Sequence, residues 1–568
     1  MQKLSYVLTL AVSSAFITGC LDSSSSIGIL SSDDVSGSSS GYKTSVFIQS
    51  EAAPGGSNGF AFDDKDLMYL TSIYARSIYV IDTTKGKIQK VFTIEDGIEG
   101  PDDIAMDADN NMYWTSFFTG NIGKTTPKGE TTLQFVNLFV NPIAFSADGR
   151  LFTALDFFGS GIYELDPNFI EAPKLVGPDI KLNGMSFGPD GLLYAPSPEA
   201  SQIVSVDVDN SIVNVLMENM SVPATVKFNS KGEAYSATEG DGRIFRMNLN
   251  TDPVTTETLT YLERGIDNMG FDSTDRLFVS NSHNGSIIEI LPDNSTREIL
   301  PPGFVTPSGI AVKTNDDGSK AVYLADVFAL IEFDAATGKE ISHARDDLMP
   351  GGLEGPSTVS VDGDNFILTS VIFPNIQVWD HVKKEPISEY TGYVGAVNAI
   401  RFQSDIVVAE LGTGFKEPRL ILMDDADTKR QTIADASHGL VTPAGLVARG
   451  GNLWVSDRAT GKILQVASDG IPLSTPITVA TGLDKPEGLA MDSANRILVV
   501  ESGKGQLSRL DLATGQLDVL ASKLGLGREG LAALAPTFMF NGVAVDDEDV
   551  IYVTAEIDNA IYRIEPKK

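Results

Sequence analysis

Side chains with carboxylate or amide oxygens recur at one position of a pattern that repeats along the chain. The pattern opens with a residue that we call the lip residue, followed by a small or apolar residue and a short apolar strand. Such oxygens are hard ligands that suit Ca2+, which takes roughly 6–8 of them, waters included. In the first half of the chain the lip residues are Asn58, Asp102, Asn141, Asn183, Ala224 and Asp267. The candidate metal ligands among them are Asp102, Asn141, Asn183 and Asp267.

A structural interpretation of the same residues stays open. Asn followed by Gly is typical of a tight backbone turn, so these side chains could simply support the entry into a strand. The second half of the chain has fewer oxygen-bearing lip residues, with only one carboxylate, and predicts a metal site more weakly. Its lip residues are Ser308, Ser357, Asn398, Ala444, Glu487 and Asn541.

Aromatic side chains occur in segments that we expect to be loops on the same face as the lip residues. They lie near Arg76 and Asp156, and loop aromatics are less easily explained as core than strand aromatics. An apolar wall beside a polar lip is typical of a small-molecule site. Packing between neighbouring repeats is the alternative explanation. The candidate ligand-binding residues are Asn58, Tyr74, Phe117, Phe118, Phe157 and Phe158.

The repeats predict the elements that position these side chains. Successive lip residues are about 40–55 residues apart, the spacing of four-stranded propeller blades. Short alternating segments such as Leu67-Met-Tyr-Leu-Thr, separated by Asp- and Gly-rich turns, indicate β-strands. We therefore predict an all-β protein of about twelve four-stranded blades, arranged as two six-bladed β-propellers. The first strand of each blade lies nearest the propeller axis, so the lip residues should converge at one mouth of a central channel.

Four segments are expected in chain order. They are a signal peptide (1–19), a lipidated Cys with a Ser/Gly-rich tether (20–43), a first propeller (44–301) and a second propeller (302–568). The last repeat lacks an outer strand, and residues 44–50 form an extra strand that could supply it. In that case the first and last repeats would share one ring, and we keep the tandem order as the prediction.

The N-terminus predicts a secreted, membrane-anchored protein. A short basic start and an apolar run too short to span a bilayer are typical of a signal peptide. The run ends in Ile17-Thr-Gly-Cys20, which resembles the lipobox of bacterial lipoproteins. The resemblance implies that Cys20 carries acyl chains such as palmitate, and Leu21 after it implies the outer membrane. The folded part would then stand in the periplasm or at the cell surface.

Bulk properties exclude several functions. The formal net charge of −34 repels phosphate backbones, so nucleic acid is not an expected partner. One cysteine allows no disulfide within the chain. The four histidines are too scattered for a recognised zinc spacing.

The repeats resemble a known group of propellers. Pro101-Asp-Asp-Ile-Ala-Met-Asp, Pro307-Ser-Gly-Ile-Ala-Val and Pro486-Glu-Gly-Leu-Ala-Met-Asp are similar to the NHL, gluconolactonase and virginiamycin-lyase-like six-bladed propellers. The resemblance implies the fold more strongly than an activity, since this fold hosts lactonases, lyases and binding modules. The metal-binding order of the gluconolactonases is not reproduced, because Ala224 stands where an Asn is expected. The His pair of the lyases is also missing, as His283 is the one histidine of the first six repeats.

Two functions follow as hypotheses. The first is an outer-membrane-anchored module that binds an unknown small molecule or protein on the lip face of the first propeller. The second is a Ca2+-dependent, lactonase-like hydrolase, in which the metal polarises a carbonyl and activates water. Whether the protein is an enzyme is left open by the sequence.

Overall fold

The structure is a computed structural model that describes residues 41–52, 55–156, 159–346, 352–370, 373, 375–530 and 540–567. Cys20, the expected signal peptide and most of the expected tether lie outside these residues, as do Phe157 and Phe158. The end of the expected tether does not stay a linker, because Tyr42 and Lys43 already belong to a strand.

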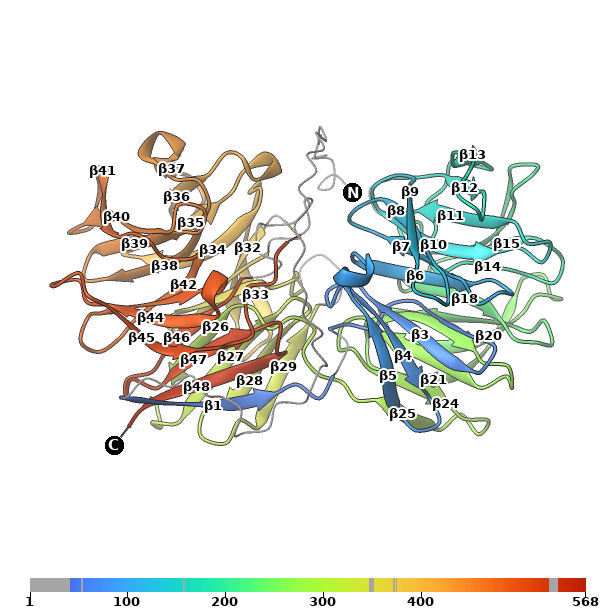
Figure 1. Cartoon of the computed structure of the whole chain (residues 1–568), viewed down its shortest axis with the longest axis horizontal. Helices are drawn as coiled ribbons and strands as arrows, with labels where there is room; N and C mark the ends of the chain where they lie inside the picture. The colour runs from blue at the N-terminus through green and yellow to red at the C-terminus, as the bar shows by residue number, and fades with distance from the viewer. Residues whose placement is uncertain are drawn as a thin grey trace. The chain divides into compact units, whose positions relative to one another are not determined.

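The described chain forms twelve four-stranded antiparallel sheets, which confirms the predicted all-β class and the number of blades. It divides into two compact units (Figure 1). Of the described residues, we call those within 50–306 the first unit, and those within 41–49, 307–530 and 540–567 the second unit. Among the described residues, none of the helices has the length and apolar character needed to cross a bilayer.

The first unit holds six sheets, each built from four strands consecutive in sequence. The strands are β2 Phe60–Phe62, β3 Leu67–Ser72, β4 Ser77–Asp82, β5 Lys87–Phe92; β6 Pro101–Met106, β7 Met112–Ser116, β8 Asn121–Thr125, β9 Thr131–Phe135; β10 Val140–Phe145, β11 Leu151–Leu155, β12 Ile162–Leu165, β13 Lys174–Val176; β14 Ser186–Phe187, β15 Leu193–Ser197, β16 Gln202–Asp207, β17 Ile212–Met217; β18 Pro223–Phe228, β19 Ala234–Thr238, β20 Arg243–Asn248, β21 Thr255–Tyr261; β22 Ile266–Phe271, β23 Leu277–Asn281, β24 Ile287–Ile290 and β25 Thr296–Leu300.

The second unit also holds six sheets, and four short 3-10 helices occur in the described chain. The strands are β26 Ile310–Thr314, β27 Lys320–Asp326, β28 Ala329–Asp334, β29 Glu340–Arg345; β30 Thr358–Asp362, β31 Asn365–Thr369, β32 Asn375–Asp380, β33 Glu385–Thr391; β34 Ala396–Phe402, β35 Asp405–Glu410, β36 Arg419–Met423, β37 Arg430–Asp435; β38 Pro443–Arg449, β39 Asn452–Asp457, β40 Lys462–Ser468, β41 Ile471–Ala480; β42 Pro486–Met491, β43 Ile497–Glu501, β44 Gln506–Leu510, β45 Leu517–Ser522; and β1 Tyr42–Gln49 with β46 Val543–Val545, β47 Ile551–Ala555 and β48 Ala560–Pro566. The helices are η1 Ile94–Asp96, η2 Thr413–Phe415, η3 Ala436–His438 and η4 Ser502–Lys504.

Apolar side chains form the core between neighbouring sheets. Ile78 and Val80 of β4 pack with Met112 and Trp114 of β7, so the first and second sheets share one cluster. The turn between β2 and β3 uses Asp63, whose Oδ1 accepts hydrogen bonds from the backbone N–H of Lys65 and Leu67, both at 2.9 Å. An Asp that caps its own turn needs no metal ion, which agrees with turn chemistry in these hairpins.

Within each unit the first strands of successive sheets contact one another, and the order of contacts returns to its start. In the first unit β2, β6, β10, β14, β18 and β22 follow one another, and β22 contacts β2. In the second unit the order is β26, β30, β34, β38, β42, β46 and again β26. A clasp between the sixth and first sheets supports this order, since Ser273 Oγ donates to Asp66 Oδ2 at 2.7 Å.

The last sheet is completed by a strand from the start of the chain. β1 pairs with β48 from Tyr42↔Pro566 to Gln49↔Ala560, so blue β1 lies beside red β48 in Figure 1. This pairing covers the outer edge of β48, which would otherwise expose unpaired backbone groups.

The unit boundaries differ from the expected ones at both ends. Residues 44–49 were expected in the first propeller, but β1 joins the second unit. Residues 302–306 were expected in the second propeller, but they stay with the first unit, where the Phe304 N–H donates to Ser50 Oγ at 2.8 Å. The first and last repeats do not share a unit: only the strand that precedes the first repeat crosses over.

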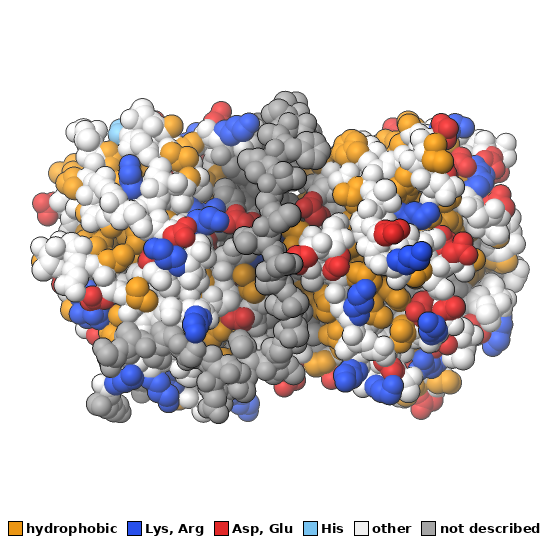
Figure 2. Space-filling model, in the orientation of Figure 1, with side chains coloured by type: hydrophobic (Ala, Val, Ile, Leu, Met, Phe, Trp, Pro, Cys, Tyr) orange, Lys and Arg blue, Asp and Glu red, His pale blue; other side chains and the backbone are white. Residues whose placement is uncertain are grey.

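The acidic excess of the chain is not gathered into one patch on the face drawn in Figure 2. Acidic and basic side chains are interspersed there among hydrophobic and neutral ones.

Candidate functional site

Backbone hydrogen bonds hold lip residues of neighbouring sheets side by side. The N–H of Gly59, which follows Asn58, donates to the carbonyl of Asp102 at 2.8 Å. In the second unit the N–H of Gly488 donates to Asn541 O at 3.1 Å, and the N–H of Gly542 donates to Ser308 O at 3.2 Å. The last of these bonds joins the sixth sheet to the first. We call the lip residues of each unit, with the loops after its second strands, the first mouth and the second mouth.

The glycine after the lip residue has a packing reason. A Cβ at Gly542 would lie 2.8 Å from the carbonyl oxygen of Ser308, and one at Gly488 would lie 2.6 Å from that of Asn541. Real Cβ atoms do not approach a backbone that closely, so only glycine lets the neighbouring sheet come near. The lip-Gly pattern is thus a signature of the contact between blades.

Three repeats of the first unit carry a polar side chain in the glycine position, and these side chains bind one another. Asn268 Nδ2 donates to Asp103 Oδ1 at 3.1 Å, and Thr225 Oγ1 donates to Asn268 Oδ1 at 3.0 Å. Asp103 Oδ2 also accepts from the backbone N–H of Ile143 at 3.1 Å. Burial raises the pKa of Asp103, while Lys227 and these hydrogen bonds lower it. This network, which we call the axial network, joins the second, third, fifth and sixth sheets.

The axial network was missed from the sequence. The signal was the departure from glycine at Asp103, Thr225 and Asn268, which lie directly after Asp102, Ala224 and Asp267.

Two of the predicted site residues bind each other at the first mouth. Asn58 Nδ2 donates to Asp267 Oδ1 at 3.3 Å, and Asn58 Oδ1 accepts from the Ile73 N–H at 3.1 Å. Burial, then repulsion from Glu239 and Asp103, raises the pKa of Asp267 well above its usual value, against the lowering by Asn58 and Lys227. Asn58 therefore both supports its own strand entry and holds the carboxyl of Asp267.

Asp102 is a carboxyl at this mouth for which the described residues provide no hydrogen-bonding partner. Its residue is 4% exposed, and in the described part of the chain its side chain has no hydrogen-bonding or ion-pair partner. Burial raises its pKa well above the usual value, and repulsion from Asp267, Asp103 and Asp156 raises it further. The structure thus brings Asp102 and Asp267 within electrostatic reach of each other.

Aromatic rings gather in the loop that follows β7, the strand paired with the strand of Asp102. The rings of Phe117 and Phe118 lie 5.1 Å apart, and the ring of Phe117 lies 5.2 Å from that of Phe139, all three half-buried. Phe117 follows Ser116, which pairs with Pro101 directly before Asp102. The backbone N–H of Asp156 donates to Phe139 O at 3.4 Å. The sequence indicated Phe117 and Phe118 but missed Phe139, which precedes the third sheet.

The other predicted residues of this wall are placed as follows. Tyr74 is 8% exposed, in the loop after β3, and Arg76 in the same loop lies 4.0 Å from Glu99. Phe157 and Phe158 lie outside the described residues.

A histidine and a glutamate extend the polar part of the first mouth. His283 Nε2 lies 3.2 Å from Glu239 Oε1, and His283 is 2% exposed. The two residues follow β23 and β19, so they come from the loops of the sixth and fifth sheets. Because Glu239 also raises the pKa of Asp267, it lies within electrostatic reach of the lip.

The predicted metal ligands are only partly brought together. The described residues contain no group of three or more His, Cys, Asp or Glu side chains that could hold a metal ion. The Oδ1 of Asn183 accepts from the N–H of its own neighbour Gly184 at 2.7 Å, as expected for an Asn that supports a strand entry. A calcium site of Asp102, Asn141, Asn183 and Asp267 stays a prediction. To bind the ion through Oδ1, Asn183 would have to break its hydrogen bond with the Gly184 N–H.

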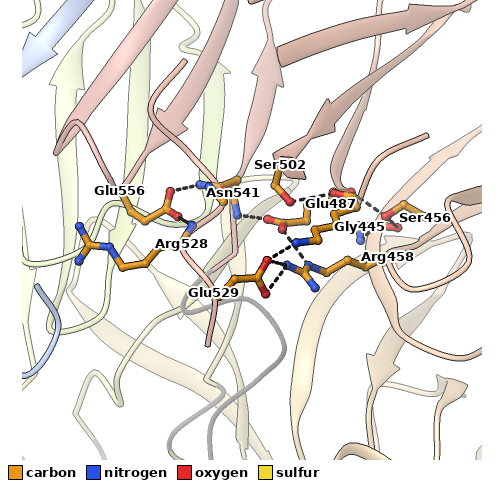
Figure 3. Close-up of polar contacts among 11 residues, drawn as sticks. Gly445, Ser456, Arg458, Glu487, Ser502, Arg528, Glu529, Asn541 and Glu556 are labelled. Atoms are coloured by element: carbon orange, nitrogen blue, oxygen red, sulfur yellow. Dashed lines mark hydrogen bonds and ion pairs between the residues drawn. The ribbon is translucent and has the colours of Figure 1, made fainter. Parts of the chain in front are cut away.

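At the second mouth a cation of the chain itself, Arg458, pairs with the lip carboxyl (Figure 3). Glu487 is fully buried, and its Oε1 accepts from Arg458 Nε at 3.2 Å, while Oε2 accepts from the Asn541 N–H at 2.9 Å. Arg458 Nη2 continues to Glu529 at 3.4 Å. Burial raises the pKa of Glu487 to about 7, against the lowering by Ser502 and Arg458.

Asn541 links this network to a second buried carboxyl. Its Nδ2 donates to Glu556 Oε2, and its Oδ1 accepts from the Gly527 N–H at 2.9 Å. Burial raises the pKa of Glu556. A cavity of about 240 Å3 lies between the first strands of all six sheets of this unit. The carboxylate and amide at this mouth are thus held by partners from the chain itself.

No protein-family model matches this chain, and no curated protein matches it. Among solved structures, it is similar to a streptogramin B lyase (16% identity, 50% of this chain and 95% of that chain, TM-score 0.37) and to virginiamycin B lyase from Staphylococcus aureus (15%, 50% and 96%, 0.37). It is also similar to a gluconolactonase from Xanthomonas campestris (15%, 42% and 87%, 0.35). At these identities and TM-scores the similarities carry no inference about what this chain does.

Proposed function

We propose that this protein is a lipid-anchored binding module of two six-bladed propellers, whose first mouth holds a small ligand. The observation that carries the proposal is Asp102, a buried carboxyl without a hydrogen-bonding partner among the described residues. The half-buried ring of Phe117 directly follows β7, the strand that pairs with the strand of Asp102. A buried carboxyl without a partner is costly to the fold, and a ligand that pairs with it would offset that cost. At the second mouth the corresponding lip carboxyl, Glu487, is paired with Arg458.

Binding is favoured over metal-dependent hydrolysis at the same mouth. A hydrolase of the gluconolactonase type would need several oxygen ligands around one ion. Here Asn58 uses its carboxamide for Ile73 and Asp267, and Asn183 uses its oxygen for Gly184. These bonds favour structural roles for the two amides.

A thermal-shift screen of neutral, acidic and basic metabolites on the chain from Gly41 onward tests the binding proposal. A native-state ligand raises apparent stability by mass action. We expect at least one compound to give a saturable shift that Phe117→Ala abolishes. The control variant is Phe373→Ala. Phe373 is an exposed residue of the second unit, so this substitution should leave the thermal shift unchanged. If no compound gives a saturable shift, the first mouth is not a small-molecule site, and a protein partner becomes the alternative.

Anchoring at the outer membrane is the second part of the proposal and rests on the sequence around Cys20. Two or more acyl chains give stable attachment, whereas one alone is marginal. We expect a palmitate analogue to label the wild type and not Cys20→Ser, which should appear in the soluble envelope fraction. Equal labelling of both forms would contradict the anchor.

A further inference from the structure

We propose that the ligand of the first mouth is an organic cation, a primary amine carried on an aromatic or apolar body. This inference rests on the proposed function and adds the chemical class of the ligand. It is carried by the Asp102 carboxyl, which has no hydrogen-bonding partner within the described ranges, by the position of the aromatic rings, and by the contrast between the two mouths.

The charges around Asp102 favour a cation. Asp267, Asp103 and Asp156 all lie within electrostatic reach of it. Two basic groups of the first mouth have acidic neighbours of their own: Arg76 lies beside Glu99, and His283 lies beside Glu239. Lys227 acts on Asp103 and Asp267 and is not among the groups that lower the pKa of Asp102. An anionic ligand would add to this repulsion, whereas an ammonium would relieve it.

At the second mouth the chain itself provides a cationic partner for a buried lip carboxyl. There Glu487 accepts a hydrogen bond from the guanidinium of Arg458 at 3.2 Å. Both carboxyls lie at the second residue of the first strand of a blade, Asp102 in β6 and Glu487 in β42. Among the described residues a cation pairs with Glu487 and none pairs with Asp102, so a cationic ligand at Asp102 would have the role that Arg458 has at Glu487.

A metal ion fits this position less well than an ammonium group. Ca2+ takes roughly 6–8 oxygen ligands, whereas an ammonium donates three hydrogen bonds. The described residues bring together no three His, Cys, Asp or Glu side chains around one point. The carboxyls of Asp102 and Asp267 would accept two of the three hydrogen bonds that an ammonium donates.

The aromatic rings account for the body of the ligand. Phe117 starts the loop that leaves the strand paired with Pro101, next to Asp102. Asp156 joins the two features, because it raises the pKa of Asp102 and its N–H donates to Phe139 O. Phenyl rings attract a nearby cation through their π faces and pack against an apolar body. An arylalkylamine has both parts in the right order.

Calorimetric titration of the chain from Gly41 onward with three matched probes tests this inference. The probes are 2-phenylethylamine, 2-phenylethanol and 3-phenylpropionate, at pH 7 and constant ionic strength. We expect saturable binding of the amine, affinity at least tenfold lower for the alcohol, and no binding of the carboxylate. Saturable binding of the carboxylate or the alcohol as tight as that of the amine would overturn the inference, and so would the absence of saturable binding by the amine.

Two variants place the amine at Asp102. Asp102→Asn keeps the shape of the side chain and should weaken amine binding at least tenfold. Asp64→Asn removes one charge from an exposed turn of the same unit and should leave the affinity unchanged. Equal weakening by both variants would indicate long-range attraction alone and would overturn the assignment. The probe series on the wild type keeps the test valid if Asp102→Asn fails to fold.

The outcomes separate this inference from the proposed function. If the metabolite screen gives a Phe117-dependent shift with a neutral or acidic compound, the binding function stands and the amine class is wrong. If the screen gives no shift with any compound, the binding function itself is contradicted.

Discussion

Asn268 donates a hydrogen bond from its carboxamide to the carboxylate of Asp103 at 3.1 Å, although 165 positions separate the two residues in the chain. The bond joins the sixth sheet of the first unit to the second. Both residues occupy the position that glycine fills in the repeats around Gly59, Gly488 and Gly542. A repeat that gives up the close backbone approach of glycine is here tied to its neighbours by side chains.

Removing this tie should destabilise the first unit. We expect Asn268→Ala to lower its free energy of unfolding by about 1–3 kcal/mol, because Asp103 and Thr225 lose a buried partner. Urea denaturation measures this loss when unfolding is monitored by hydrogen exchange in peptides from β6 and β22. Asn250→Ala, in an exposed turn of the same unit, is the matched control. Equal effects of the two substitutions would show that the axial network does not stabilise the unit.

The strand β1 should stabilise the second unit and not the first. A chain that starts at Ser50 lacks β1, so it exposes the edge of β48 and loses the packing of Val46 against the last sheet. We expect a loss of at least about 2 kcal/mol, or roughly 4–8 °C in the Tm of the second unit. Calorimetry of the shorter chain and of a chain that starts at Gly41 compares the Tm of the second unit in the two. An unchanged second unit in the shorter chain would contradict the pairing.

Stability should fall as the pH rises from about 4.5 to about 7, partly because of Glu487. Its folded pKa of about 7 lies above the ordinary value of 4.5, so the native state binds the extra proton in this window. The contribution is fully present below about pH 4.5 and is lost as the pH rises through 7. We expect Glu487→Gln to flatten the dependence of the Tm of the second unit on pH between 5 and 8. An unchanged slope would contradict the raised pKa.

Calcium titration tests the competing metal interpretation of the first mouth. We expect Ca2+ to stabilise the chain no more than NaCl of equal ionic strength, because screening alone acts on a net charge of −34. A saturable rise in Tm that Asp267→Asn abolishes and Asp64→Asn retains would contradict this expectation. It would also support the calcium-dependent hydrolase.

The sequence was sufficient for the blades because each repeat carries its own strands and turns. Met68 and Leu70 alternate with half-buried neighbours in β3, and Asp63 caps the turn before it, so both features are local. The lip residues could also be found, since a Gly such as Gly542 marks the close approach of two blades.

The partners across a mouth could not be found in the same way. The pairings of Asp103 with Asn268 and of Glu487 with Arg458 depend on which blades meet around the ring and on side-chain reach. The residues of one repeat indicate neither which blades are neighbours nor how far their side chains reach. The place of β1 was visible as an unpaired strand, but its effect on the unit boundary required the fold.

Hydrogen exchange with and without 2-phenylethylamine tests the central claim most directly, because it locates a ligand without assuming its site. The account predicts slower exchange in residues 101–106, 116–121 and 139–144, with no change around Arg458 and Glu487. Protection at the second mouth, or none at a concentration that saturates calorimetric binding, would contradict a ligand site at Asp102.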